Sequence, residues 1–187
     1  MATERDEWGK REFTYKGIFV MESFIDMITR WLKSKNFIKE NKDVNEKYYI
    51  IEELPDSSYN ITFEWSFENK DGDFFKTIEI KVVCVALKKQ EILYNNQKIT
   101  VDNGEIGISL KGMIEFDKDE KLIKNWWKKN FYKYFWKPKY GAYYKNNRDE
   151  FFKDLEKLYN SILAFFEVEG KISDVKIRPL GFKEIQQ

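Results

Sequence analysis

The chain has 187 residues, of which 42% are hydrophobic and 35% are charged, with 33 basic and 32 acidic side chains. This composition is typical of a folded domain and excludes a disordered tail. The absence of histidine and the single cysteine exclude an intrachain disulfide, a Ser-His or Cys-His catalytic pair and the usual zinc ligand sets. We expect one domain over residues 1–187. We also expect a cytoplasmic location, because the sequence shows neither a signal peptide nor an apolar run of membrane-spanning length.

The first elements along the chain are a short strand and an amphipathic helix. Residues 1–10 are polar and are predicted to be frayed. Glu12 to Phe19 alternates as a strand does. From Met21 to Lys35 the apolar residues recur at spacings of three and four, which predicts a helix with one apolar face. That face holds Met21, Phe24, Ile25, Ile28, Trp31 and Leu32.

Strands separated by turn residues occupy the middle of the chain. Asp71-Gly72 and Asp102-Asn103-Gly104 are typical of tight turns, and a hairpin is plausible at Asn95-Asn96-Gln97. Tight turns join antiparallel neighbours, so we expect an antiparallel sheet of about five to six strands. The predicted strands are Lys47 to Leu54, Tyr59 to Glu68, Asp73 to Leu87, Glu91 to Tyr94, Lys98 to Val101 and Glu105 to Phe116.

Two helices follow the sheet in this prediction. The first begins at Asp117 or Asp119 and ends near Trp136, before Pro138. The second begins near Asn146 or Asn147 and ends at Gly170, and residues 171–187 form a tail or a short strand. The fold class is therefore α+β, with the N-terminal helix and both C-terminal helices packed on one face of the sheet. This order of elements is similar to that of helix-grip ligand-binding folds.

The segment from Lys121 to Arg148 has an unusual surface composition. It contains nine basic residues, ten aromatic residues and no acidic residue, so the other 159 residues carry a net charge of −8. A helix packed on the sheet with a solvated lysine face would explain much of this pattern. The aromatic residues between Phe135 and Tyr144 are harder to explain as a connecting loop, because some of them should be exposed or covered by a partner.

We therefore predict a binding protein without catalytic activity or cofactor, whose basic-aromatic surface at about 121–145 contacts another protein or a second copy. Single-stranded nucleic acid or RNA is the alternative partner, because lysines would pair with phosphates and rings with bases. A membrane surface ranks third. No residue is assigned a catalytic or metal-binding role. The predicted binding residues are Trp126, Trp127, Lys128, Lys129, Trp136, Lys137, Lys139, Tyr140, Tyr143 and Tyr144.

Two other functions stay open at this point. The chain could carry a small apolar ligand between a curved sheet and the 147–167 helix, in a cavity lined by Phe63, Trp65 and Phe67. A hydrolase would need paired carboxylates, since histidine is absent. The candidate pairs are Glu52 with Glu53 and Glu64 with Glu68, although the second pair is expected to face water. Cys84 lies in the most apolar strand and is expected to be a buried hydrophobic residue.

Overall fold

A five-stranded antiparallel sheet and two helices form the part of the chain that the structure describes. The structure, a computed structural model, describes residues 5–38, 46–94, 97–116 and 137–170. The sheet has the order β1-β5-β4-β3-β2. The described elements in chain order are β1 (Arg5–Phe19), α1 (Met21–Ser34), β2 (Glu46–Glu53), β3 (Tyr59–Asp71), β4 (Phe74–Tyr94), β5 (Gln97–Phe116) and α3 (Lys137–Gly170). The α+β class and the antiparallel sheet are thus confirmed.

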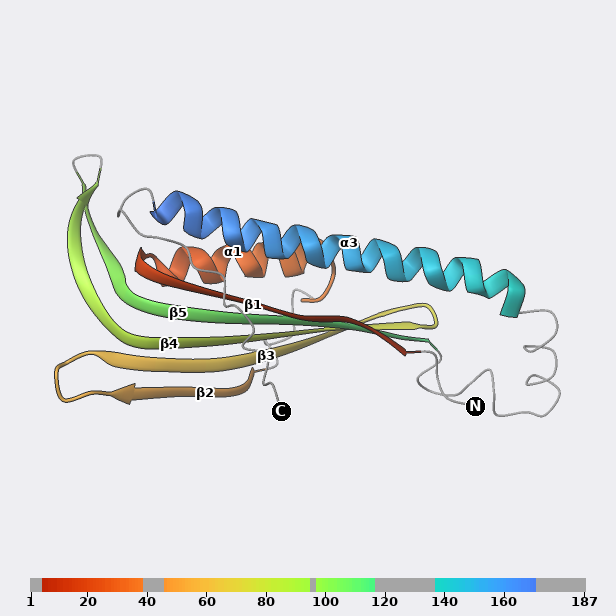
Figure 1. Ribbon diagram of the computed structural model, residues 1–187, viewed down its shortest axis with the longest axis horizontal. Helices are drawn as coiled ribbons and strands as arrows, with labels where there is room; N and C mark the ends of the chain where they lie inside the picture. Colours follow the sequence, from red (N-terminus) through yellow and green to blue (C-terminus); the bar gives the residue numbers. More distant parts are fainter. Residues whose placement is uncertain (1–4, 39–45, 95–96, 117–136, 171–187) are drawn as a thin grey trace, which may run out of the picture.

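Both helices lie on the same side of the sheet (Figure 1). α3 runs along β1 and β5, while α1 lies beside it near the end where β4 and β5 bend towards the helices (Figure 1). The apolar face of α1 buries Phe24, Ile28 and Leu32 completely. β3 alternates as expected, because Phe63 and Trp65 are buried on the side of the helices while Glu64 between them is partly exposed. The side of the sheet that the helices cover is therefore the core.

The first strand begins earlier than the predicted Glu12. Residues 5–10 belong to β1 and pair with the end of β5, from Arg5 opposite Glu115 to Lys10 opposite Lys111. The long β5 offers backbone partners there, so the segment is a strand even though most of its side chains are polar and exposed. A bulge at Gly9, whose φ is +82°, adjusts the register. The prediction of a frayed 1–10 segment therefore fails for residues 5–10.

Asp102-Asn103-Gly104 lies inside β5 instead of forming a turn. β4 and β5 are each one long strand, and the four separate strands predicted for this region merge into these two. A bulge interrupts their pairing, because Val85 pairs with Glu105 whereas Lys88 pairs with Asn103. Ala86 has a φ of +51° there. Such a bulge bends and twists a strand pair, which accounts for the curved end of the sheet in Figure 1.

The second C-terminal helix begins about ten residues earlier than predicted. α3 starts at Lys137, so Pro138 lies in its first turn. Backbone N–H groups in the first turn have no partner within the helix, so the N–H that proline lacks is not needed there. Pro138 therefore lies within the first turn of α3, and not in a loop before this helix as predicted. The other predicted helix, over residues 117–136, lies outside the described residues. α1 begins at Met21 as expected and ends one residue before Lys35.

Replacing Gly104 by alanine is expected to destabilise the bulge. A Cβ atom on Gly104 would lie 2.8 Å from Leu87 Cδ2 and 3.0 Å from the backbone oxygens of Val85 and Ala86. Backbone atoms cannot move aside cheaply, so we expect Gly104→Ala to lower the free energy of unfolding by about 1–2 kcal/mol in urea denaturation. Gly107→Ala is the matched control, because the nearest atom to its added Cβ is 3.7 Å away. Equal effects of the two substitutions would contradict this account.

Candidate functional site

A groove of about 900 Å³ opens at the curved end of the sheet, on the side that carries the helices. Its walls come from the start of α1, from β2 and β3, and from the bent parts of β4 and β5. The bulge places these segments together, because it turns β4 and β5 towards α1 (Figure 1). The apolar lining residues are Val20, Met21, Ile25, Tyr49, Ile51, Tyr59, Ile61 and Leu87.

A hydrogen-bonded tyrosine and aspartate occupy one wall of the groove. The hydroxyl of Tyr59, on β3, donates to Asp102 Oδ1 on β5 at 2.5 Å. The other carboxylate oxygen of Asp102 accepts a long hydrogen bond from the backbone N–H of Met21, at 3.4 Å. This N–H is the first of α1, whose preceding residue Val20 makes no side-chain cap. Asp102 therefore supplies negative charge at the positive end of the helix dipole.

The Tyr59 phenol is held in its protonated form. Burial raises its pKa well above the ordinary value of 10.0, and the neighbouring Asp102 carboxylate raises it further. A phenolate next to a carboxylate would place two negative charges together in a partly buried site. Tyr59 therefore acts as a hydrogen-bond donor in this groove at neutral pH, and it is not a ready general base.

The polar residues around the groove are mostly acidic. Glu22 and Asp26 come from α1, Glu53 from β2 and Asp102 from β5. Lys89 is the basic residue among the lining residues. Asp26 also pairs with Arg30 at 3.4 Å. With this guanidinium included, four carboxylates stand against two basic groups, so the opening keeps a negative potential. The groove thus combines apolar walls with acidic groups. It suits a molecule that has an apolar body and a cationic or hydrogen-bond-donating group.

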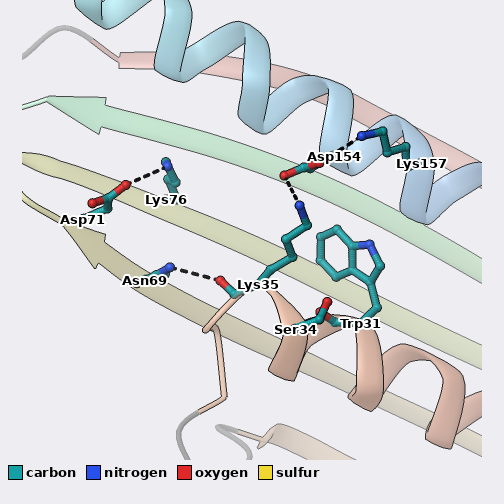
Figure 2. Close-up of polar contacts among 8 residues, drawn as sticks. All are labelled: Trp31, Ser34, Lys35, Asn69, Asp71, Lys76, Asp154 and Lys157. Carbon is teal, nitrogen blue, oxygen red and sulfur yellow. Dashed lines mark hydrogen bonds and ion pairs between the residues drawn. The ribbon is translucent and has the colours of Figure 1, made fainter.

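A polar cluster fastens the other end of α1 to the sheet and to α3 (Figure 2). Lys35 Nζ lies 2.6 Å from Asp154 Oδ2 on α3, and Lys157 Nζ lies 3.6 Å from the other Asp154 oxygen. The side-chain amide of Asn69, on β3, donates to the backbone oxygen of Lys35 at 3.2 Å. The Asn69 amide gives a hydrogen-bond donor to a backbone carbonyl at the end of the helix, and the ion pairs hold α1 over the sheet. The cluster is therefore a structural joint, and it helps to position the wall that α1 gives to the groove.

The predicted basic-aromatic surface falls largely outside the described residues. This holds for Trp126, Trp127, Lys128, Lys129 and Trp136. Lys137, Lys139 and Tyr140 form the first turn of α3, but their side chains are not described.

Two of the predicted binding residues have described side chains. Tyr143 is 53% exposed, with its ring 5.3 Å from that of Phe74. Tyr144 is buried, and its ring lies 6.0 Å from Phe74 and 6.3 Å from Phe116. Tyr143 thus presents its ring to solvent, whereas Tyr144 is part of the core. The binding role of the surface as a whole stays a prediction.

The three aromatic residues predicted to line a ligand cavity are packed against one another instead. The rings of Phe63 and Trp65 are 4.6 Å apart, and those of Trp65 and Phe67 are 6.2 Å apart. All three are buried in the core. They do not line the groove, to which β3 contributes Tyr59 and Ile61. The groove lies next to β2 and the start of α1, whereas the predicted cavity was to lie under the 147–167 helix.

Of the candidate catalytic carboxylates, Glu52 and Glu53 are adjacent on β2 and point to opposite faces of the sheet, whereas Glu64 and Glu68 share one face of β3. Glu64 lies on the face opposite the helices, where it binds Lys47 Nζ at 2.9 Å and the Tyr48 hydroxyl at 3.2 Å. The hydrogen bond from Lys47 lowers the pKa of Glu64. Glu53 lines the groove on the other face. Cys84 is fully buried, as expected, and burial raises the pKa of its thiol to about 12.

Sequence reasoning missed Tyr59 and Asp102. They are 43 residues apart, and neither belongs to a recognisable motif. Asp102 looked like a turn residue because Asn and Gly follow it. No pattern in the sequence reports the bulge that brings the two side chains together.

Comparison of the chain with protein-family models, with curated proteins and with solved structures found no match. Among the described residues, no group of three or more acidic or cysteine side chains is placed to hold a metal ion. In the same part of the chain, neither helix has the length and apolar character needed to cross a membrane.

Proposed function

We propose that the protein binds a small cationic amphiphile in the groove between α1 and the curved end of the sheet. The observation that carries the proposal is the pairing of apolar walls with an acidic polar set in one open cavity. Its volume of about 900 Å³ is that of a site for a small molecule. An alkyl chain would contact Ile25, Ile51 and Ile61, and a positively charged group would face the carboxylates.

The exposed apolar side chains in the groove supply the driving force. Tyr49 and Ile51 are more than half exposed although they face a concave surface. Covering such side chains contributes about 25 cal/mol per Å² of apolar area removed from water. The charged rim adds selectivity more than affinity, because exposed charge pairs are worth less than about 1 kcal/mol each. We therefore expect the chain length of a ligand to set its affinity, and the sign of its charge to set its specificity.

A substitution that fills the groove should prevent binding. Thr100 is exposed and lines the groove, so Thr100→Trp places an indole ring in the space without disturbing the core. We expect decyltrimethylammonium, titrated below its micelle concentration, to bind wild-type protein in a saturable manner by calorimetry. Thr100→Trp should weaken this binding by at least about tenfold, a change of about 1.4 kcal/mol.

Two controls define what would overturn the proposal. Glu105→Trp adds the same ring to the same strand at an exposed position outside the groove lining, and should leave affinity unchanged. Decyl sulfate has an equal chain and the opposite charge, so it should bind at least about tenfold more weakly than the ammonium compound. Absence of saturable binding, or equal binding by wild-type protein and Thr100→Trp, would show that the groove is not the site.

A further inference from the structure

β2 is an edge strand of the sheet that the structure describes. It is the last strand in the order β1-β5-β4-β3-β2, and within the described ranges only β3 pairs with it. Three consecutive large apolar residues of β2 are exposed: Tyr49 by 51%, Ile50 by 56% and Ile51 by 58%. Successive strand residues point to opposite faces, so the apolar surface of this strand wraps around the edge. An open edge with such residues is a ready template for another strand.

The opposite edge of the sheet carries charges that discourage strand addition. β1 exposes charged residues along its length. Both edge strands have a bulge near one end, at Gly9 in β1 and between Glu46 and Tyr48 in β2, so the charge pattern is what separates them. In β2 the four residues from Tyr48 to Ile51 carry no charge, and the charged residues stand only at its two ends. The two edges therefore differ in the way expected if β2 alone pairs with another chain.

The sequence of β2 fits a second copy of itself. In an antiparallel pair related by a two-fold axis perpendicular to the sheet, residues that face each other lie on the same face of the sheet. The axis therefore passes between the two copies of one residue, which face each other. An axis at Tyr49 would set the apolar Ile51 against Lys47. An axis at Ile51 would set Glu52 and Glu53 against apolar residues of the other copy.

An axis at Ile50 avoids both problems. Ile50 then faces itself, Tyr49 faces Ile51, and Glu52 faces the uncharged Tyr48. Lys47 Nζ stays with Glu64 and Glu79 of its own chain, at 2.9 and 2.8 Å. Apolar pairs in the middle of the strand are a favourable cross-strand combination. We infer that two copies of this chain associate through β2, in antiparallel register centred on Ile50, and so form one continuous ten-stranded sheet.

Cysteine cross-linking tests both the interface and its register. Ile50→Cys should form a disulfide-linked dimer of twice 22.7 kDa under mild oxidation, since the two new thiols would face each other. The native Cys84 is buried and does not interfere. Val85→Cys is the matched control, because Val85 is 47% exposed but lies on β4, which has neighbours on both sides. It should stay monomeric.

Light scattering of proteins without added cysteine provides the second readout. Wild-type protein should show a mass that rises towards that of a dimer with concentration. Ile50→Lys, which sets two ammonium groups against each other at the axis, should stay at 22.7 kDa with an unchanged circular dichroism spectrum. A wild-type monomer at every concentration, or equal cross-linking of Ile50→Cys and Val85→Cys, overturns the inference. Ligand binding by monomeric Ile50→Lys is expected to persist, so the groove and the interface are tested separately.

Discussion

Phe166→Ala is expected to lower the free energy of unfolding by about 3–5 kcal/mol, the usual cost of removing a buried phenylalanine ring. Phe166 is completely buried near the end of α3. Its ring centre lies 5.4 Å from that of Phe13, 4.9 Å from Tyr15, 5.9 Å from Phe19 and 5.3 Å from Phe24. The side chain thus joins β1, α1 and α3, and truncation would leave a cavity among three elements. Urea denaturation followed by circular dichroism measures the loss.

Phe152→Ala on the same helix is the matched comparison. Phe152 is only partly buried and packs against the edge of the core, so its truncation opens no enclosed cavity. We expect less than half of the effect of Phe166→Ala, because the cost depends on how much space remains unfilled. A Phe166→Ala loss no larger than that of Phe152→Ala would mean that α3 does not hold the core together at this point.

The sequence predicted well those elements whose side chains alternate between water and core. In β3 the buried Phe63 and Trp65 alternate with the partly exposed Thr62 and Glu64, and in α1 the buried Phe24, Ile28 and Leu32 recur at helical spacing. In both cases, burial on one face leaves a periodic trace in the sequence. This trace establishes the class of the fold and the place of α1.

Features that depend on contacts between distant segments left no such trace. Residues 5–10 form a strand because β5 offers backbone partners. The first turns of α3 contain Pro138 and Gly141, which weaken the local helix signal, but Tyr144 packs against Phe74 and Phe116 and stabilises this part of the helix. Tertiary packing outweighed local propensity there. The groove follows the same rule, because the bulge that forms it is a property of paired strands.

Asp102→Ala is expected to lower the free energy of unfolding by about 2–3 kcal/mol, since it removes a charge-assisted hydrogen bond and leaves the Tyr59 hydroxyl without this acceptor. It also removes the negative charge beside the first N–H of α1. Glu105→Ala deletes a carboxylate three residues further along β5 at an exposed position, and should cost less than about 0.5 kcal/mol. Equal losses in urea denaturation would show that Asp102 does not join α1 to the sheet.

The pH dependence of stability gives a second test of the same contact. The folded state raises the pKa of Tyr59 above the unfolded value of 10.0 and that of the Cys84 thiol from 9.0 to about 12. Folded protein therefore keeps these protons while the unfolded chain releases them, so stability is fully present below about pH 9 and falls as the pH rises further. Burial is the first cause of both shifts and the Asp102 carboxylate contributes to both. Asp102→Ala should thus make the fall between pH 9 and about 11 shallower without abolishing it, and unfolding midpoints that decline in parallel with wild type would contradict the assignment.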